Sequence, residues 1–351
     1  MNAYKTLYNQ NTLLSMLSYK RPHNSHSEIN FINKFIKPSC NYEDAYGNCF
    51  AFVDGTENKE NLPTILFTAH TDTVHKFGGK QKIKLHYEPV KDAVHLFASV
   101  KNDVLGADCG SGCFILLAMI EHFQKNPPLH NQLYAFYRNE ESGGIGSYES
   151  IKHCTEPMQT VLQNIDKVIS FDRMNYGDIV SVQSGSTCCS DEFAAQFKEQ
   201  FNYTPARGSF TDSANFTDEV SNSGFKECTN LSIGYFDQHT KSEKQDLTFL
   251  IDILLPKLLT FNWDHLQVFR KYDQIEFPDY LGNYYSGNYN LDTFSITEQN
   301  LKNLVKNDPD KIYNFLNAFC LIDELIINHG AEFLESHNFS ADDINNYYGD
   351  M

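Results

Sequence analysis

Histidine and carboxylate side chains follow the apolar segments of this 351-residue chain with unusual regularity. The segments TILFTA, LYAFYR, DKVISF and LSIGYF read as buried strands, and an open α/β sheet collects its ligands where such strands end. Imidazole and carboxylate groups are the ligands of Zn²⁺, Mn²⁺ or Co²⁺ where no thiolate takes part. Because separate segments deliver the groups, their joint pattern predicts a metal centre, although each group alone is usually structural. The groups are His70, Asp72, Asp108, Glu140, Glu141, Asp172 and His239.

A pair of adjacent metal ions would use this set fully. Two ions about 3.5–4 Å apart need one carboxylate that bridges them, and a histidine plus a second carboxylate for each ion. The side chains of adjacent glutamates such as Glu140 and Glu141 diverge, so one can bind metal while the other stays free to act as a base. Asp72 follows His70 by two residues, which suits it to accept the second ring N–H of that histidine and fix its tautomer.

The glycine-rich stretch LGADCGSGCFILLA offers a competing chemistry. Cys109, Cys113 or Cys188 could act as a nucleophile, which requires a histidine and an orienting acid within reach. The candidate histidines His70 and His239 are better explained as metal ligands, so a cysteine hydrolase is disfavoured. Cys113 opens an apolar run and is expected to pack in the core.

The strand-like segments alternate with helical ones, which indicates an α/β domain with a mixed, largely parallel central sheet flanked by helices. Strands are predicted over 47–55, 64–70, 133–141, 166–172 and 228–236, with a hairpin over 82–100. Helices are predicted over 11–18, 26–36, 113–125, 147–154, 190–200 and 242–261. We therefore expect a catalytic domain over 1–264 and a helical C-terminal extension over 265–351.

Charge and cysteine content narrow the expected partners and location. A net charge of −17 repels nucleic acid and anionic membrane, so neither is expected to bind. The sequence contains no apolar run of about 18 residues, and its N-terminus has no signal-peptide core. Nine irregularly spaced cysteines are typical of reduced thiols in the cytoplasm.

Five motifs occur in order along the chain: TAHTDTV (68–74), LGADCGSG (105–112), RNEESGG (138–144), SFDRM (170–174) and GYFDQHTKSE (234–243). As a set they resemble the co-catalytic di-zinc exopeptidase clan, which contains bacterial leucyl aminopeptidases, glutamate carboxypeptidases and peptidase T. The resemblance covers roughly residues 10–262. It implies the zinc exopeptidase fold and hydrolysis of an amide bond with two divalent ions, zinc first and Mn²⁺ or Co²⁺ as substitutes.

The resemblance also implies a role for each residue. Glu140 corresponds to the general base, which takes a proton from a water bridging the metals and returns it to the leaving amine. Asp72 corresponds to the carboxylate that supports the first histidine, and Asp108 to the ligand shared by both ions. The full set of metal ligands is His70, Asp108, Glu141, Asp172 and His239.

Spacing within the motifs favours the single-domain aminopeptidase branch of the clan. Carboxypeptidase-type members carry an inserted domain between the fourth and fifth ligands, and the 67 residues from Asp172 to His239 are too few for one. The segment RGSFTDSANF resembles that branch's polar loop along the substrate cleft, where Asp212 either supports the site or forms an Asx-turn. One position departs from the family: a second aspartate usually follows the bridging one through a cis peptide, and here it is Cys109.

The substrate class stays open at this stage. A peptide with a free amino terminus suits the acidic chain, which favours an aminopeptidase. If Arg138, Arg173 or Arg207 clamps a substrate carboxylate, a carboxypeptidase or N-acyl-amino-acid deacylase becomes the alternative. A position on the surface or at a sheet edge is the more common one for each arginine. A peptidase-like binding protein without turnover is disfavoured because no ligand and no base is missing. Assembly into a homo-oligomer also stays open.

Overall fold

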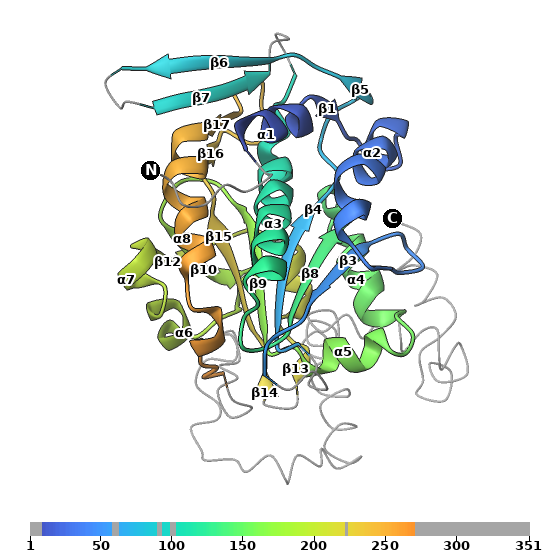
Figure 1. Cartoon of the computed structure of the whole chain (residues 1–351), viewed down its shortest axis with the longest axis vertical. Helices are drawn as coiled ribbons and strands as arrows, with labels where there is room; N and C mark the ends of the chain where they lie inside the picture. The colour runs from blue at the N-terminus through green and yellow to red at the C-terminus, as the bar shows by residue number, and fades with distance from the viewer. Residues whose placement is uncertain (1–8, 58–62, 90–92, 99–102, 222–223, 271–351) are drawn as a thin grey trace, which may run out of the picture. The chain divides into compact units, whose positions relative to one another are not determined.

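A computed structural model of the chain describes residues 9–57, 63–89, 93–98, 103–221 and 224–270 (Figure 1). Its centre is one mixed sheet with the strand order β11-β10-β15-β9-β4-β8-β3-β2, and β12 pairs with β10. The inner strands β15, β9, β4 and β8 are parallel, whereas β3 and β10 run antiparallel to their inner neighbours. The predicted mixed, largely parallel sheet is therefore confirmed. The strands are β2 (Tyr42–Glu43), β3 (Cys49–Val53), β4 (Ile65–His70), β8 (Gln132–Tyr137), β9 (Lys167–Arg173), β10 (Asp178–Gln183), β11 (Ser186–Thr187), β12 (Thr204–Arg207) and β15 (Glu227–Ser232).

Helices cover both faces of this sheet, because alternate strand residues are apolar on both sides. On one face Phe67 and Phe171 belong to the same core as α1, α3 and α8, and α3 runs along β4 and β9 (Figure 1). On the other face Leu66 and Val168 pack with Leu162 of α5. The helices are α1 (Gln10–Leu17), α2 (His26–Phe31), α3 (Ala107–Lys125), α4 (Ile145–Lys152), α5 (Met158–Asn164), α6 (Asp191–Ala195), α7 (Lys198–Phe201) and α8 (Leu255–Thr260).

A second, antiparallel sheet has the strand order β16-β17-β7-β6. Its β6–β7 pair is the predicted hairpin, and β17 joins this hairpin to the segment that follows the last predicted ligand. Two short antiparallel pairs, β1–β5 and β13–β14, complete the strands of the described residues. These strands are β1 (Tyr19–Lys20), β5 (Gly79–Lys80), β6 (Ile83–Glu88), β7 (Ala93–Ala98), β13 (Val220–Ser221), β14 (Gly224–Phe225), β16 (Tyr235–Phe236) and β17 (Lys244–Asp246).

Several predicted boundaries were wrong. The closing helix expected over 242–261 begins only at Phe249, because Lys244–Asp246 pairs as a strand with the hairpin. The helix expected from 113 begins at Ala107, where a buried carboxylate from another loop caps it. The elements β10, β12 and α5 were not predicted.

The C-terminal part of the chain is only partly described. The chain divides into units 1–279 and 280–351, and the predicted helices after residue 270 lie outside the described residues. The described start of the predicted extension, 265–270, packs on the domain, since Arg270 donates to the carbonyls of Cys188, Thr217 and Lys226. In the described part of the chain, no helix combines the length and apolarity needed to cross a bilayer.

One buried ion pair fixes the N-terminal helices to the ends of β4 and β8. The fully buried Glu28 of α2 accepts from the Nε and Nη2 atoms of Arg138, at 3.2 and 2.9 Å, and from the hydroxyl of Thr71, at 3.0 Å. The backbone N–H of Asn24 also donates to it, at 2.6 Å. Arg138 follows β8 and Thr71 follows β4, so this carboxylate joins two loops that carry predicted site residues.

We expect Arg138→Met to lower the free energy of unfolding by about 3–5 kcal/mol, because it leaves the Glu28 carboxylate buried without its cation. Lys37→Met is the control: Lys37 pairs with Glu43 at the surface, at 2.7 Å, and its loss is expected to cost less than about 1 kcal/mol. Urea unfolding followed by circular dichroism measures both. Equal losses for the two variants would show that the buried pair has no special structural role.

Candidate metal centre

The first two site residues lie on one face of the sheet. In β4 and β9 the hydroxyls of Thr68 and Ser170 are hydrogen-bonded at 2.7 Å, so both side chains point to the same side. Since strand side chains alternate, His70 and Asp172 point the same way two residues further along. His70 Nε2 lies 3.5 Å from Asp172 Oδ1. The parallel pairing of adjacent strands thus brings together two residues that are about 100 positions apart.

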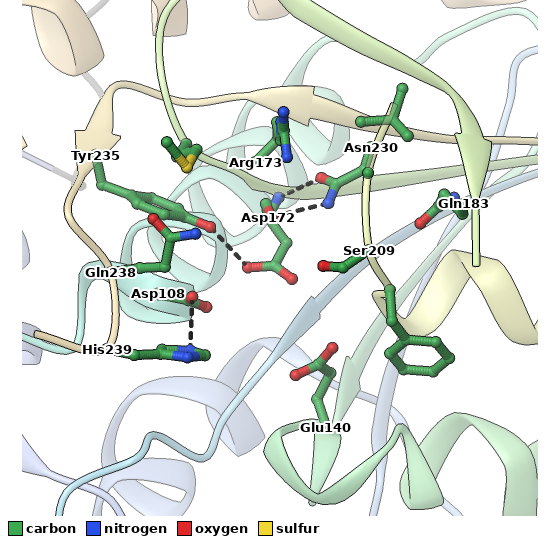
Figure 2. A pocket seen from close by; sticks show the side chains of 14 residues that line it. Asp108, Glu140, Asp172, Arg173, Gln183, Ser209, Asn230, Tyr235, Gln238 and His239 are labelled. Carbon is green, nitrogen blue, oxygen red and sulfur yellow. Dashed lines mark hydrogen bonds and ion pairs between the residues drawn. The ribbon is translucent and has the colours of Figure 1, made fainter. Parts of the chain in front are cut away.

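Asp108 lies between the two histidines. Its Oδ1 is 3.0 Å from His70 Nε2. Its Oδ2 is 3.1 Å from His239 Nε2, the pair that Figure 2 shows. Asp108 follows Gly106, which has a φ of 74°, and its peptide bond to Cys109 is cis. One carboxylate therefore offers one oxygen to each histidine, which is the arrangement that a bridging ligand requires.

The side chains of the two adjacent glutamates point in different directions. Glu141 Oε2 lies 3.0 Å from His239 Nε2, whereas Glu140 Oε2 lies 3.7 Å from His70 Nε2. Both residues belong to a short 3-10 helix, Glu140–Ser142, that follows the left-handed Asn139. Adjacent side chains thus point to opposite halves of the site.

Asp72 holds these glutamates through their backbone. Its Oδ1 accepts the N–H of Glu140 at 3.0 Å, and its Oδ2 accepts the N–H of Glu141 at 3.2 Å. The expected contact with His70 is looser: Nδ1 of His70 lies 3.5 Å from Asp72 Oδ1 and 3.2 Å from the Asp72 carbonyl oxygen. The carboxylate of Asp72 therefore positions the glutamate turn as well as facing the histidine.

These donors form two overlapping groups. Oxygen and nitrogen atoms of His70, Asp108 and Glu141 lie within 4.8 Å of one another, and so do ligand atoms of His70, Asp172 and Cys109. A carboxylate oxygen of Glu141, Oε1, is buried and has no hydrogen-bond partner. The mixed imidazole and carboxylate set and this unsatisfied oxygen fit divalent ions of the Zn²⁺ type.

The charges of the site explain why a cation fits it. Burial raises the pKa of Glu140 well above its usual range, and burial and Asp108 raise the pKa of Asp172 to about 6. Hydrogen bonds to Asp108 and Glu141 raise the pKa of His239 to about 11. The carboxylates thus repel one another, which helps to raise the pKa of Asp172, and their negative charge keeps His239 protonated. Bound dications would compensate this negative charge.

A cavity of about 90 Å³ opens beside the donors (Figure 2). The predicted cleft loop over 207–216 lines it through Gly208, Ser209 and Phe210. The remaining lining residues are Asp108, Glu140, Asp172, Arg173, Met174, Val180, Gln183, Asn230, Tyr235, Gln238 and His239. Three predicted metal ligands, Asp108, Asp172 and His239, and the predicted base Glu140 therefore line one cavity, next to apolar and amide side chains.

Asp212 does not line this cavity. It is buried at the start of the 3-10 helix Asp212–Phe216, and neither carboxylate oxygen has a hydrogen-bond partner. The expected Asx-turn is therefore not formed. Burial raises the pKa of Asp212 to about 7.

Several residues that hold the predicted ligands were not predicted from the sequence. Thr211 Oγ1 donates to Asp172 Oδ2 at 2.7 Å, and Tyr235 OH donates to Asp172 Oδ1 at 3.3 Å. Asn230 accepts the N–H of Asp172 and donates to its carbonyl. Glu243 lies in the last motif, four residues after His239, and that position was the one available signal for it.

The three arginines differ in their surroundings. Arg138 is committed to Glu28, and Arg207 on β12 is exposed. Arg173 lines the cavity, but its Nε and Nη2 atoms both lie 2.9 Å from Asp178 Oδ2. Its guanidinium is therefore already paired with a carboxylate of the protein.

The two cysteines beside Asp108 are fully buried. The thiol of Cys109 donates to the carbonyl of Phe171, and that of Cys113 to the carbonyl of His70, each at 3.1 Å. Burial raises the pKa of Cys109 well above its usual range and that of Cys113 to about 12. Neither thiol has the ionisation that a nucleophile needs.

Comparisons with known proteins identify a family and a shared fold. Residues 50–224 match peptidase family M28. Aminopeptidase PepT from Bacillus cereus ATCC 10987 superimposes with a TM-score of 0.52 at 13% identity, over 72% of this chain and 98% of that one. A tripeptidase from Staphylococcus aureus subsp. aureus mu50 gives 0.51 at 13% identity, over 71% and 95%. The Pyrococcus horikoshii TET1 peptidase gives 0.51 at 14% identity, over 72% and 98%. A comparison with curated protein sequences gave no match.

We expect the stability of the metal-free protein to fall as the pH rises from about 4 to 7, partly through Asp212. Its pKa is about 7 in the folded state and 3.8 when exposed, so only the folded state holds the proton between these values. One such group changes the free energy of unfolding by up to about 1.4 kcal/mol per pH unit. Asp212→Asn should flatten this dependence in urea unfolding with a chelator present. An unchanged slope would contradict the assignment.

Proposed function

Since this chain belongs to peptidase family M28, a family of the zinc exopeptidase clan, we propose that it is an aminopeptidase with two zinc ions and Glu140 as general base. The observation that carries the proposal is the position of Asp108, with one carboxylate oxygen toward each of His70 and His239. A carboxylate with one oxygen toward each of two histidines is the arrangement that a pair of adjacent metal ions requires.

The ligands would divide into two sets around Asp108. His70 and Asp172 would hold one ion, and Glu141 and His239 the other. Zn²⁺ is the expected ion, and Mn²⁺ or Co²⁺ suits the same donors. When bound, the ions would polarise the scissile carbonyl and lower the pKa of a water molecule.

Glu140 remains outside both ligand sets and faces the cavity. Its raised pKa suits a group that must accept a proton from the attacking water and then release it to the leaving amine. Asp72 fixes the turn that carries it by accepting the backbone N–H groups of Glu140 and Glu141. The base is thereby held beside the reacting atoms while its carboxylate stays uncommitted.

The cavity favours a substrate with a free amino terminus. Of its lining carboxylates, Asp108 and Asp172 would be neutralised by the metal ions, whereas Glu140 stays free of metal and can attract an ammonium group. Its lining arginine, Arg173, is paired with Asp178, so a carboxylate substrate would have to displace that partner. A carboxypeptidase or an N-acyl-amino-acid deacylase is therefore the second candidate, and a binding protein without turnover is the third.

Two further parts of the proposal concern the setting of the enzyme. The described cysteines are free thiols, which suits the reducing cytoplasm. The Pyrococcus horikoshii TET1 peptidase can assemble into a tetrahedron or a large octahedral shell, and we propose a homo-oligomer for this chain too. Analytical ultracentrifugation of the full chain tests that assembly.

Glu140→Gln should lower the hydrolysis of aminoacyl-anilides by about 10²–10⁴-fold, because the amide cannot accept the proton of water. Chelation should abolish the activity of the wild-type protein, and added Zn²⁺ should restore it. The variant should bind as much zinc as the wild type does.

A panel that includes N-acyl amino acids and peptides with a blocked amino terminus separates the candidates. Turnover of blocked substrates alone would favour the second candidate. No metal-dependent turnover of any substrate, with Glu140→Gln identical to the wild type, would contradict the proposal that the protein is an enzyme.

Cys109→Ser should keep activity within about threefold, because a serine hydroxyl can still donate to the carbonyl of Phe171 and no thiolate takes part. Initial rates with the same anilide substrate measure this. Loss of activity to the level of Glu140→Gln would instead favour a mechanism in which Cys109 is the nucleophile.

A further inference from the structure

Glu243 is a buried carboxylate that the proposed mechanism does not use. It is 2% exposed, and its two oxygens accept backbone N–H groups from four consecutive residues. Oε2 accepts from Leu105 and Gly106, at 2.9 and 3.0 Å. Oε1 accepts from Ala107 and Asp108, at 2.7 and 3.1 Å. One side chain thus satisfies the N–H groups that the start of α3 leaves unpaired.

These contacts hold a backbone that is not helical. Asp108 has φ and ψ of −77° and 103°, and Cys109 has −111° and 37°, although both lie within the span of α3. Regular helical hydrogen bonds therefore do not fix the carboxylate of Asp108. The backbone N–H of Asp108 instead points at Glu243, 135 residues away along the chain.

Glu243 ends a turn, 237–243, that also carries His239. This residue has a φ of 62° and its side chain is 49% exposed, so surrounding packing does little to hold it. The turn is closed by hydrogen bonds from Thr240 N to the Asp237 carbonyl, at 3.3 Å, and from Glu243 N to the Thr240 carbonyl, at 3.1 Å. Anchoring the side chain of Glu243 under α3 consequently restrains the backbone that presents His239.

We infer that Glu243 is a positioning residue that fixes the bridging ligand Asp108 and the half-exposed ligand His239 relative to each other before metal binds. The inference rests on the proposed metal site. A preorganised pair of ligands loses less conformational freedom when an ion binds, so the metal affinity should depend on this carboxylate.

The test compares two variants that each remove a buried carboxylate. Glu243→Gln keeps the size of the side chain, but its amide NH₂ faces two backbone N–H groups that then lack an acceptor. The matched control is Glu227→Gln. Glu227 is also fully buried and accepts the N–H groups of Ser190, Phe269 and Arg270, at 2.8, 2.9 and 3.0 Å, away from the metal ligands.

Zinc affinity is measured by competition with a chromophoric chelator, and unfolding of the metal-free proteins is measured alongside. We expect Glu243→Gln to bind zinc about 10–100-fold more weakly than the wild type. Glu227→Gln should lose stability yet keep its zinc affinity within about twofold. Substitution with Co²⁺ gives a second readout, since the visible absorption of the Glu243→Gln complex should differ from that of the wild type.

Unchanged zinc affinity in Glu243→Gln, or an equal loss in both variants, overturns the inference. If Glu243→Gln does not fold, Glu243→Asp replaces it: this variant keeps the charge but shortens the reach, and it must still weaken zinc binding for the inference to stand. A wild-type protein that binds no zinc would contradict the proposed function instead, so the two failures are distinct.

Discussion

Buried carboxylates that accept backbone N–H groups are the interaction on which this site depends. Asp72 holds the glutamate turn, and Glu243 holds the start of α3. Each carboxylate is removed from water, which is costly unless several donors compensate for the loss. The N–H donors lie on loops other than the one that carries the carboxylate. The hydrogen bonds therefore also fix the distance between these loops, which strand pairing does not set.

The sheet supplies the coarse geometry and these contacts supply the fine geometry. Parallel pairing of β4 with β9 places His70 and Asp172 on one face, and the hydrogen bond between Thr68 and Ser170 joins the same strands two residues earlier. Asp108 and His239 have no strand to set their register, since Asp108 lies in the non-helical first turn of α3 and His239 lies in a turn. The proposed ligands on loops, Asp108 and His239, are therefore the ones that need a dedicated anchor, and Glu243 contacts or belongs to both loops.

This division explains how much the sequence could predict. The strands that carry His70 and Asp172 were predictable because short, mostly apolar segments, 65–69 and 168–171, directly precede these residues. The predicted ligands come together because parallel strands share one edge, which follows from fold class alone. The role of Glu243 was not predictable, because its donors are more than a hundred residues away and a carboxylate in a polar loop has no periodic signal. For the same reason the sequence analysis extended the closing helix through β17, whose pairing partner is distant in the chain.

Cys109 also joins two segments of the site by a hydrogen bond to the backbone, but with a neutral thiol in place of a carboxylate. It stands where the family usually has a second aspartate, and its thiol donates to the carbonyl of Phe171, which directly precedes Asp172. A carboxylate could not make this contact, because two acceptors would face each other. A charged group there would also raise the pKa of Asp172 further, since like charges disfavour ionisation. The thiol therefore ties the end of β9 to α3 without adding to the negative charge that the proposed metal ligands already concentrate.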